Sequence, residues 1–498
     1  MNKLFKKINR KIDRMKLNLI YSESIDNIIG VNNDLFCKLP SDLEMFQKIT
    51  STKMNGCENV IIMGFNTWTS LKRPLKGRIN VVITQNNKDK VNGVNGVNGV
   101  MVFDSLNSCF DTFKTIDYGR VFVIGGPTLF SSVMTDHYDM IDIIYQTRIN
   151  HNVDIGKIHN STDVVYNDIV INEQDFSLVK SETKTNVGLL YDMKDRYISK
   201  EINYTENVHQ KNALINHQEY QYLNTLKGIL KNKINCSRNG NVYSEFGIRM
   251  VFDLREGFPL LTTKRIPWKT VLRELIWFMN GSTDNKLLQD QNVHIWDGNG
   301  SKEFLESRGL SYEEGDLGPI YGFQWRHFGA EYKDSQTDYT DQGVDQLKWI
   351  INEIKVNPSS RRLIMNAWNP MDIHKMALPP CHVMVQFNIE DGFIDAQLYQ
   401  RSGDMFLGVP FNISSYSFLL HIIGSITGYI PRKFIHIIGD AHIYEDHVSA
   451  VQEQLLRIPY LFPKLEIGGD INIDTINETN FNIHDYEYYT GIKAQMNV

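Results

Sequence analysis

Residues 377–400 read ALPPCHVMVQFNIEDGFIDAQLYQ, in which two strand-like runs lie on either side of the dipeptide Asp391-Gly392. An Asp-Gly dipeptide between two such runs is among the strongest signals for a tight β-hairpin. Cys381 follows two prolines and directly precedes the first run. The pattern therefore predicts an antiparallel pair of strands with a thiol at the point where the first strand begins.

Helices precede this hairpin in the sequence. TVLRELIWFMN at 270–280 is a strongly apolar helix that Gly281 ends, and QEYQYLNTLKGILK at 218–231 has the periodicity of an amphipathic helix. The stretch 199–216 before them is polar and predicts a linker. We therefore expect an α+β domain over 217–498.

The first part of the chain has a different texture. Short apolar runs such as LNLIYS (17–22), NVIIMGF (59–65) and RVFVIGG (120–126) alternate with helical stretches, a pattern typical of an α/β mixed sheet flanked by helices. This pattern predicts a domain over 17–198. We interpret residues 1–16 as a basic, solvated extension and the Val-Asn-Gly repeat at 91–100 as a surface loop.

Composition excludes several classes of function. The 52 Lys and Arg against 58 Asp and Glu give a formal charge of −6, so we expect no nucleic-acid partner; only the basic N-terminus favours one. No apolar run approaches the ~20 residues of a membrane span. Five scattered cysteines predict neither a disulfide framework nor a metal site. A reducing, cytoplasmic location is therefore expected.

Asp42 is the first candidate for chemistry. It lies in KLPSDLEMF, where Pro40 predicts a helix start and Phe46 lies four residues further along the same helix face. A carboxyl group in an apolar pocket has a raised pKa and can hold a protonated nitrogen heterocycle through paired hydrogen bonds. The alternative is an exposed acid that stabilises the start of its helix.

Gly125 and Gly126 are a weaker signal. They lie where the strand RVFVIGG meets the helix TLFSSVM, a place where a phosphate can approach bare backbone. The pair lacks the spacing of a dinucleotide fingerprint, so a tight turn is the alternative.

Four motifs in order resemble the dihydrofolate reductase family: IIGVNNDLFCKLPSDLEMF (28–46), VIIMGFNTWTSL (60–71), PLKGRINVVIT (74–84) and VFVIGGPTLF (121–130). The resemblance implies reduction of dihydrofolate by NADPH, with Asp42 binding the pteridine and assisting its protonation. By position it implies a folate pocket at Ile20, Leu43 and Phe46, a tail-binding Arg78, a supporting Thr147, and cofactor contacts at Thr67, Gly125 and Gly126.

Some positions depart from that family's pattern. Cys37 stands where a tryptophan is usual, and the Phe-Pro pair that closes a long loop is missing at 154–160. Phe65 and Thr84-Gln85 replace residues that select the 2′-phosphate of the cofactor, so NADH is the alternative to NADPH. A reductase half that serves as a scaffold is the corresponding alternative for function.

Cys381 is the second candidate for chemistry. A thiol is a nucleophile when it is deprotonated, and guanidinium groups favour the thiolate. Arginines in a fork geometry also bind a dianionic phosphate. The candidates are Arg238, Arg361, Arg362 and Arg401. The alternatives are a structural cysteine and a surface turn of arginines.

The remainder of the chain closely resembles the thymidylate synthase family. The resemblance is carried by GFPLLTTKR (257–265), RELIWFMNGSTD (273–284), GDLGPIYGFQWRHFGAEY (315–332), SRRLIMNAWNP (360–370), MALPPCH (376–382), QLYQRSGDMFLGVPFNISSY (397–416) and GDAHIYEDH (439–447). It implies reductive methylation of dUMP by 5,10-methylenetetrahydrofolate in a homodimer. The order of the two resemblances matches fused dihydrofolate reductase–thymidylate synthases.

By that resemblance, Cys381 adds to carbon 6 of dUMP and Glu274 runs the proton transfers through water. The implied dUMP contacts are Arg238, Arg401, Ser402, Asn412, His442 and Tyr444 from one subunit and Arg361 and Arg362 from the other. The implied folate contacts are Trp296 and Asp404, with Tyr321 and His382 nearby. The loop that holds Arg238 is one residue shorter than usual, which makes this contact the weakest of the set.

Overall fold

The structure is a computed structural model, and it divides into two units, one that ends at Ile215 and one that begins at Asn216. It describes residues 15–71, 73–94, 99–151, 164–191, 197–237, 240–469 and 471–495. Most of the predicted extension at 1–16, the centre of the Val-Asn-Gly repeat and the loop at 154–160 lie outside the described residues.

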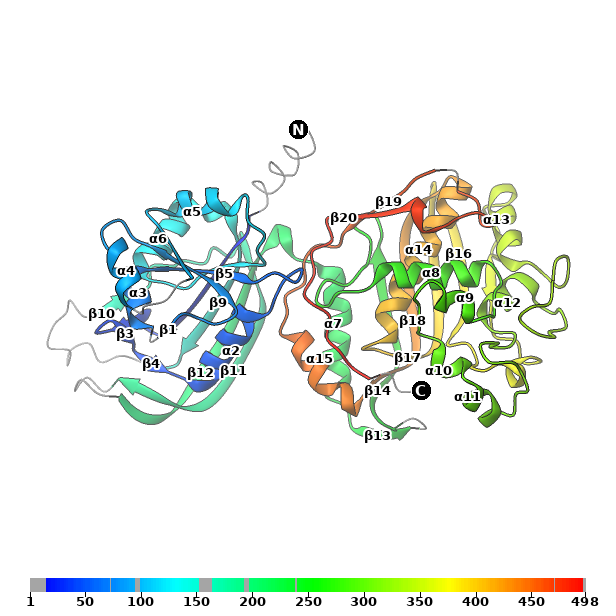
Figure 1. The fold of residues 1–498 in the computed structure, drawn as a ribbon, viewed down its shortest axis with the longest axis horizontal. Helices are drawn as coiled ribbons and strands as arrows, with labels where there is room; N and C mark the ends of the chain where they lie inside the picture. Colours follow the sequence, from blue (N-terminus) through cyan, green and yellow to red (C-terminus); the bar gives the residue numbers. More distant parts are fainter. Residues whose placement is uncertain are drawn as a thin grey trace. The chain divides into compact units, whose positions relative to one another are not determined.

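The first unit contains a mixed sheet (Figure 1). Its described strands run in the order β4 (Cys37–Lys38), β11 (Phe176–Tyr191), β12 (Tyr197–Lys211), β9 (Ile141–Ile149), β1 (Leu17–Ser24), β8 (Val121–Val123), β5 (Asn59–Gly64), β6 (Arg78–Ile83) and β7 (Val100–Phe103). Strands from β9 to β7 are parallel, and β12, β11 and β4 are antiparallel to their neighbours. A small sheet joins β10 (Val164–Tyr166), β2 (Ile28–Val31) and β3 (Asp34–Leu35).

Side chains of this sheet alternate between two apolar layers, as the period of a strand requires. On β1, Leu17, Leu19 and Tyr21 pack with α5 (Leu106–Phe113) and α6 (Pro127–Asp136). A second cluster joins the segment 28–39 to β12. The remaining helices are α2 (Pro40–Ser51), α3 (Phe65–Ser70) and α4 (Lys88–Val94).

The predicted linker at 199–216 is wrong over most of its length. Residues 197–211 form β12, which pairs with β11 on one side and β9 on the other. Since every second residue of β12 from Ile202 to Gln210 is buried, this stretch belongs to the core of the first unit. That unit therefore extends beyond 198, to Ile215.

The second unit contains a sheet in the order β13 (Ile234–Ser237), β14 (Gly240–Asp253), β18 (Ile430–Tyr444), β17 (Phe393–Asp404), β16 (His382–Glu390) and β15 (Ile364–Asn366). Only β17 and β18 pair in parallel among these described strands. A separate hairpin joins β19 (Lys464–Ile467) and β20 (Phe481–His484). The helices are α7 (His217–Ile229), α8 (Trp268–Met279), α9 (Lys286–Gln289), α10 (Asp297–Gly300), α11 (Lys302–Ser307), α12 (Tyr321–His327), α13 (Gln346–Val356), α14 (Gly408–Thr427) and α15 (Val448–Leu455).

The hairpin and helices predicted in this unit are confirmed. Glu390 pairs with Phe393 across the turn, and Asp391 and Gly392 both have positive φ, as a two-residue hairpin turn requires. The predicted apolar helix is α8, and Gly281 after it has φ +74. This hairpin fixes the position of Cys381 directly before β16.

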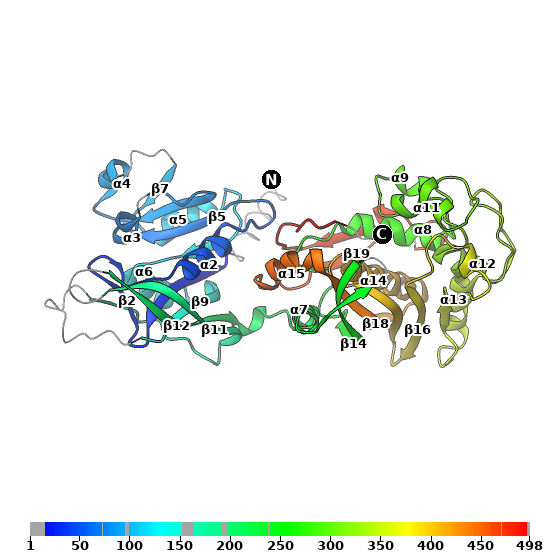
Figure 2. The same ribbon diagram turned by 90° about the horizontal axis from the view of Figure 1, so that it is seen from below.

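Helix α14 is the central helix of the second unit and packs against β17, β18 and α8 (Figure 2). It has 20 residues, and an 18-residue window within it has a mean hydropathy of 1.2, so by length and composition it is apolar enough to cross a membrane. However, 72% of that window is buried inside the unit. Burial on this scale is typical of the core helix of a globular domain.

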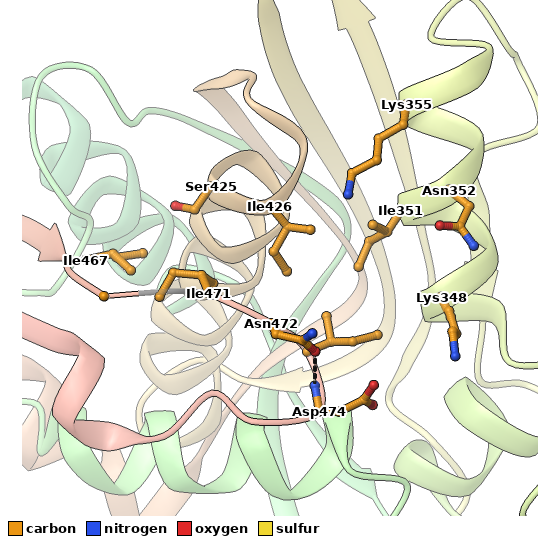
Figure 3. Close-up of a pocket in the computed structure, with 12 residues that line it drawn as sticks. Lys348, Ile351, Asn352, Lys355, Ser425, Ile426, Ile467, Ile471, Asn472 and Asp474 are labelled. Carbon is orange, nitrogen blue, oxygen red and sulfur yellow. Dashed lines mark hydrogen bonds between the residues drawn. The ribbon is translucent and has the colours of Figure 1, made fainter.

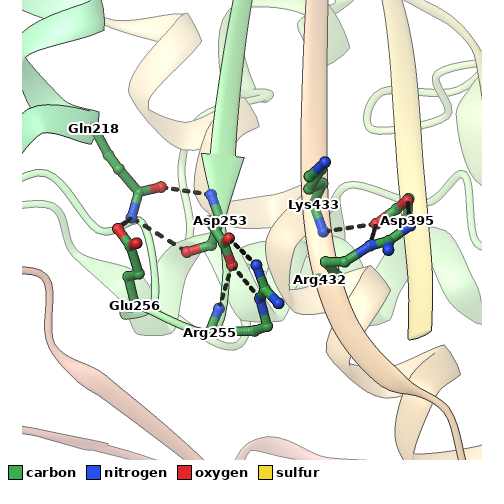
Figure 4. Close-up of polar contacts among 7 residues, drawn as sticks. All are labelled: Gln218, Asp253, Arg255, Glu256, Asp395, Arg432 and Lys433. Atoms are coloured by element: carbon green, nitrogen blue, oxygen red, sulfur yellow. Dashed lines mark hydrogen bonds and ion pairs between the residues drawn. The ribbon is translucent and has the colours of Figure 1, made fainter. Parts of the chain in front are cut away.

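Polar contacts secure one end of this sheet (Figure 4). Gln218 of α7 accepts a hydrogen bond from the backbone N–H of Asp253 at the end of β14. The guanidinium of Arg432 on β18 binds both carboxylate oxygens of Asp395 on β17, at 3.0 and 2.6 Å. These contacts tie the amphipathic helix and two strands together at the end of the sheet away from Cys381.

Candidate active sites

Asp42 lies in the first turn of α2 and points at the sheet of the first unit. The hydroxyl of Thr147 on β9 donates a 2.6 Å hydrogen bond to Oδ1 of Asp42. Burial raises the pKa of Asp42 to about 6, the hydrogen bond from Thr147 opposes the rise, and the charge of Glu206 adds to it. A carboxyl group with this pKa exchanges its proton near neutral pH, as an acid–base residue must.

The other predicted folate residues surround Asp42 unevenly. Ile20 is buried on β1, two residues from Ser22. Because Ser22 pairs with Thr147, the side chains of Ile20 and Thr147 lie on the same face of the sheet. Phe46 is half-buried on α2, and Leu43 is 46% exposed. The site is thus apolar on its sheet side and open on the side of Leu43.

Arg78 is anchored beside the same helix. Its guanidinium donates a 2.8 Å hydrogen bond to Oγ1 of Thr50, whose hydroxyl in turn donates to the carbonyl of Phe46. The guanidinium remains half-exposed at the start of β6. It can therefore hold a carboxylate while Thr50 fixes its direction.

Cys37 replaces the tryptophan that the first resemblance implied. The thiol is buried on β4, and burial together with the charge of Asp42 raises its pKa to about 12. It is therefore a neutral, apolar neighbour of Asp42. It supplies less of a pocket wall than an indole would.

Thr67, Gly125 and Gly126 lie together between β5 and α6. The N–H of Gly64 donates a 2.8 Å hydrogen bond to the carbonyl of Gly125, and the Gly125-Gly126 peptide bond is cis. A Cβ on Gly125 would lie 3.3 Å from Oγ1 of Thr67, and φ of Gly125 is +130. Glycine is therefore required here, and it leaves bare backbone at the start of a helix, where a phosphate binds well.

Cys381 is held by its backbone in the second unit. Its N–H donates a 2.7 Å hydrogen bond to the hydroxyl of Tyr321, and its carbonyl accepts one from the N–H of Arg401 at 2.9 Å. The guanidinium of Arg401 donates to the carbonyls of Pro379 and Pro380 at 2.9 and 3.0 Å. Arg401 therefore packs along the segment that precedes the thiol.

The pKa of Cys381 is raised overall, although Arg401 acts on it in the expected, lowering direction. Burial is the largest cause, and the guanidinium of Arg401 and the hydroxyl of Tyr321 act in the opposite direction. Among the described residues, Arg401 is the guanidinium whose charge acts on Cys381. Arg361 and Arg362 are exposed in the turn between α13 and β15. Arg238 lies outside the described residues.

Glu274 lies on α8, and its Oε1 accepts a 2.8 Å hydrogen bond from the indole N–H of Trp296. Burial raises the pKa of Glu274 to about 7, and the indole hydrogen bond opposes this rise. The two residues that the second resemblance assigned to protons and to folate therefore touch each other. The carboxyl group can accept or release a proton near neutral pH.

Asn412 belongs to a buried polar network under β17. Its Oδ1 accepts a 3.0 Å hydrogen bond from Gln400, whose own Oε1 lies 2.8 Å from Nε2 of His436. Asn412 also hydrogen-bonds His382, but burial, the dominant influence, lowers the pKa of His382 to about 4. Burial likewise lowers the pKa of His436, to about 3, so both histidines are neutral at pH 7 and fix the direction of the amide. Gln400 and His436 were not predicted, although Gln400 lies inside the QLYQRSGD motif.

Ser402, His442 and Tyr444 lie on neighbouring strands. Ser402 on β17 pairs with Asp440 on β18, and two residues later Asp404 pairs with His442. The rings of His442 and Tyr444 are 5.1 Å apart at their centroids, edge to face. The parallel pairing of β17 and β18 thus brings these polar residues to one region.

Asp404 ends β17 and accepts hydrogen bonds from the N–H groups of Phe406 and Leu407 at 2.8 and 3.2 Å. Burial alone would raise its pKa, but His447 and these N–H groups outweigh it and lower the pKa. Lys264 donates to the carbonyl of Phe406, and burial lowers the pKa of this lysine to about 7. His447 and Lys264 were not predicted, although both lie in quoted motifs.

A cavity of about 720 Å³ lies away from both sets of residues (Figure 3). It is bounded by α13, the end of α14 and the segment after β19, with Lys348, Lys355 and Asn472 at its rim. It contains none of the predicted site residues. Within the described ranges, no group of three or more His, Cys, Asp or Glu could hold a metal ion.

Comparison with known proteins matches each unit to one family. The family model described as thymidylate synthase matches residues 220–498, and that described as dihydrofolate reductase matches residues 16–193.

Whole-length relatives carry both names. The chain is 40% identical over 501 residues to bifunctional dihydrofolate reductase-thymidylate synthase 1 of Arabidopsis thaliana, covering 94% of each chain. It is 39% identical to the bifunctional dihydrofolate reductase-thymidylate synthase of Paramecium tetraurelia, over 96% of this chain and 98% of the relative. The protein of the same description from Plasmodium berghei (strain Anka) is 38% identical over 99% of this chain and 94% of its own.

Proposed function

The chain belongs to the bifunctional dihydrofolate reductase–thymidylate synthase family, and on this basis we propose which residues carry each of its two reactions. One reaction reduces dihydrofolate to tetrahydrofolate with NADPH. The other converts dUMP to dTMP with 5,10-methylenetetrahydrofolate and releases dihydrofolate. The observation that carries the assignment is that one chain contains both the Asp42–Thr147 pair and Cys381 beside Arg401.

In the reductase unit, Asp42 binds the pteridine ring and assists its protonation. Thr147 holds Oδ1 of Asp42, which leaves the second carboxylate oxygen for the substrate. Ile20 and Phe46 contact the ring, and Arg78 binds the carboxylate of the glutamate tail. The Asp42–Thr147 geometry favours an active reductase over a scaffold.

The residues at the β5–α6 region fit a dinucleotide. The glycine pair leaves backbone open beside Thr67, and a side chain on Gly125 would fill this space. Bound NADPH supplies the hydride, while Thr67, Gly125 and Gly126 would hold the cofactor. Phe65 and Thr84 stand at the positions that would meet the 2′-phosphate, so the preference for NADPH would depend on other contacts.

In the synthase unit, the Cys381 thiolate forms a bond to carbon 6 of dUMP. The electron pair of the C5–C6 double bond moves toward carbon 4, and carbon 5 becomes a nucleophile for the methylene group of the folate. Arg401 and Ser402 bind the phosphate. Glu274, held by Trp296, transfers protons through water, and Asp404 binds the folate ring.

Asn412 selects uracil over cytosine. Its amide is held by Gln400 and His382, so its donor and acceptor have fixed directions. A cytosine ring would present the wrong edge and leave buried polar groups unpaired, which costs about 1–3 kcal/mol per group. His442 and Tyr444 hold the ribose 3′-hydroxyl.

We also propose a homodimer through the sheet of the synthase unit. Tyr399 (36% exposed) and Ile364 (38%) alternate with the buried Leu398 and Met365, so they lie on the face of this sheet opposite the core. Exposed apolar groups on one face are typical of a surface that another protein covers. In such a dimer, Arg361 and Arg362 would reach the phosphate site of the partner and provide the charge that Cys381 lacks in one chain.

A reducing compartment such as the cytoplasm suits this enzyme, because the described structure leaves all five cysteines free.

A spectrophotometric assay of the whole protein tests both reactions in sequence. With dUMP and 5,10-methylenetetrahydrofolate, absorbance from dihydrofolate should rise; on addition of NADPH it should fall. Replacing NADPH by NADH tests the cofactor preference. Failure of dihydrofolate to form, or of either nicotinamide cofactor to consume it, would contradict the respective half of the assignment.

A further inference from the structure

A row of polar side chains crosses the reductase sheet beneath α2. Glu182 on β11 pairs with Glu206 on β12, and Glu206 pairs with Thr147 on β9. Residues that pair directly across neighbouring strands point to the same face, about 5 Å apart at Cβ. Thr147, at the end of this row, holds Asp42 through the 2.6 Å hydrogen bond. Glu206 is therefore one strand away from the group that fixes Asp42.

Glu206 has a partner of opposite charge, Lys184, on the neighbouring strand β11. Nζ of Lys184 lies 2.7 Å from Oε2 of Glu206 and 3.4 Å from Oε2 of Glu182. The side chain of Glu206 is 5% exposed, that of Lys184 34% and that of Glu182 51%. Glu206 is thus a buried carboxylate whose countercharge lies at the edge of the sheet.

The placement of Glu206 has a direct consequence for Asp42. A carboxylate inside a protein acts strongly on another carboxylate nearby, because little water screens the two charges. The charge of Glu206 opposes ionisation of Asp42, and Lys184 offsets part of this effect. Water screens Glu182, which should act much less on Asp42.

Few other charged groups face Asp42 from the elements packed around it. On β4, the thiol of Cys37 lies near Asp42, but it is neutral near pH 7. On β12 the remaining polar group is Tyr204, whose hydroxyl lies 2.8 Å from Oγ of Ser41. Glu44 and Lys48 on α2 are exposed, and Lys38 on β4 is paired with Asp34. Among the described residues, Glu206 is the group whose charge acts on Asp42, and Lys184 is its ion-pair partner.

We propose that Glu206 and Lys184 are a pair of positioning residues that set the protonation of Asp42 in the reductase reaction without touching substrate. The inference rests on the proposed role of Asp42. Glu206 holds Asp42 closer to its protonated form than burial alone does, and Lys184 limits this effect. The pair thereby determines the pH range over which the reductase can protonate its substrate.

The test is the pH dependence of hydride transfer in single turnovers of the whole protein with dihydrofolate and NADPH. If protonation limits the step, its rate falls as pH rises through the controlling pKa. Glu206→Gln removes a negative charge, so we expect the profile to move down by about 0.5–1 pH unit, with rates near pH 8 about 3- to 10-fold lower. Lys184→Met leaves Glu206 without its countercharge and should move the profile up by a similar amount.

Two further variants separate charge from structure. Glu206→Gln combined with Lys184→Met removes both charges, so its profile should lie between that of Glu206→Gln and that of the unmodified protein. Glu182→Gln is the matched control, because it removes a carboxylate that pairs with the same lysine but is screened by water. The synthase activity of the same chain serves as an internal measure of folded enzyme.

The possible outcomes are distinct. Opposite shifts for the two single variants support the proposal, since a purely structural role would lower the rate without moving the profile in opposite directions. Unshifted profiles, or equal shifts for Glu182→Gln and Glu206→Gln, would overturn it. An unmodified protein that does not oxidise NADPH with dihydrofolate would instead refute the assigned reductase activity.

Discussion

Asp42 and Cys381, the two groups to which we assign the reactions, have pKa values that the folded chain shifts in different ways. The environment of Asp42 is complete within the reductase unit, where burial and Thr147 place its pKa at about 6. Cys381 has a raised pKa, because burial outweighs the guanidinium of Arg401, which lowers it. The comparison shows that burial poises Asp42 for proton exchange near neutral pH, whereas burial opposes formation of the thiolate at Cys381; the proposed arginines of a partner subunit would favour that thiolate.

Replacement of the nucleophile should separate the two halves most sharply. Cys381→Ser replaces the thiolate by a much weaker nucleophile, so we expect synthase turnover to fall on the order of 10³-fold or more. Dihydrofolate reduction by the same preparation should stay unchanged. Synthase turnover is measured as release of dihydrofolate from 5,10-methylenetetrahydrofolate. Retention of synthase activity in the serine variant would exclude Cys381 as the nucleophile.

Glu274→Gln should have the next largest effect. The amide keeps the hydrogen bond from Trp296 but cannot transfer protons, so we expect kcat of the synthase to fall on the order of 10²-fold. The synthase rate of the unmodified enzyme should change with pH around pH 7, near the pKa of Glu274. The variant should lack this step in its pH–rate profile. An unchanged profile would assign the proton transfers to another group.

Subunit complementation tests directly whether the synthase site draws charge from a second chain. Arg361→Ala with Arg362→Ala should lower kcat/KM for dUMP about 10- to 100-fold, since each hydrogen bond to a charged group contributes about 1.5–3 kcal/mol. Mixed with Cys381→Ser protein, this variant should form heterodimers in which one of the two sites combines a native cysteine with native arginines.

Random exchange of the two variants makes half of the dimers heterodimers, so activity should recover to about a quarter of that of the unmodified enzyme. The control is each variant by itself, carried through the same mixing and exchange. Absence of recovery, despite exchange shown by differently tagged subunits, would mean that the arginines act within their own chain.

The two domain folds and the elements that local sequence signals define are confirmed, whereas the prediction for residues 197–211, which tertiary pairing makes into a strand, is wrong. The Asp391-Gly392 hairpin and the helix that Gly281 ends follow from turn chemistry that a few residues encode. Strand β12 was taken for a linker because buried polar side chains, Glu206 and Gln210, stand at positions that a core strand normally gives to apolar residues.

The site residues divide in the same way. The Asp42–Thr147 contact could be expected from motifs in register, and the structure brings the two together. The role of Glu206 could not be predicted. Its proximity to Asp42 arises from the register of β12 against β9, and the residues around position 206 do not determine this register. His447 lay within a quoted motif, but only the folded chain shows it next to Asp404.

The smallest effect that we predict concerns stability and the ionisation of Asp42. Its folded pKa of about 6 lies above its ordinary value of 3.8, so the protonated form contributes stability that is present below pH ~4 and lost as pH rises through 6. Asp42→Asn is neutral at every pH and should stabilise the reductase unit at pH 8 by about 1–2 kcal/mol, or a few degrees in Tm, with little gain at pH 4. Calorimetry of the whole protein measures the change in Tm. The unfolding transition of the reductase unit is the one whose Tm rises when NADPH is added. Asp111→Asn, on the exposed face of α5, is the control. A gain of equal size at pH 4 and pH 8 would show that the charge of Asp42 is not its source, and that the reductase site is less dependent on burial than its geometry indicates.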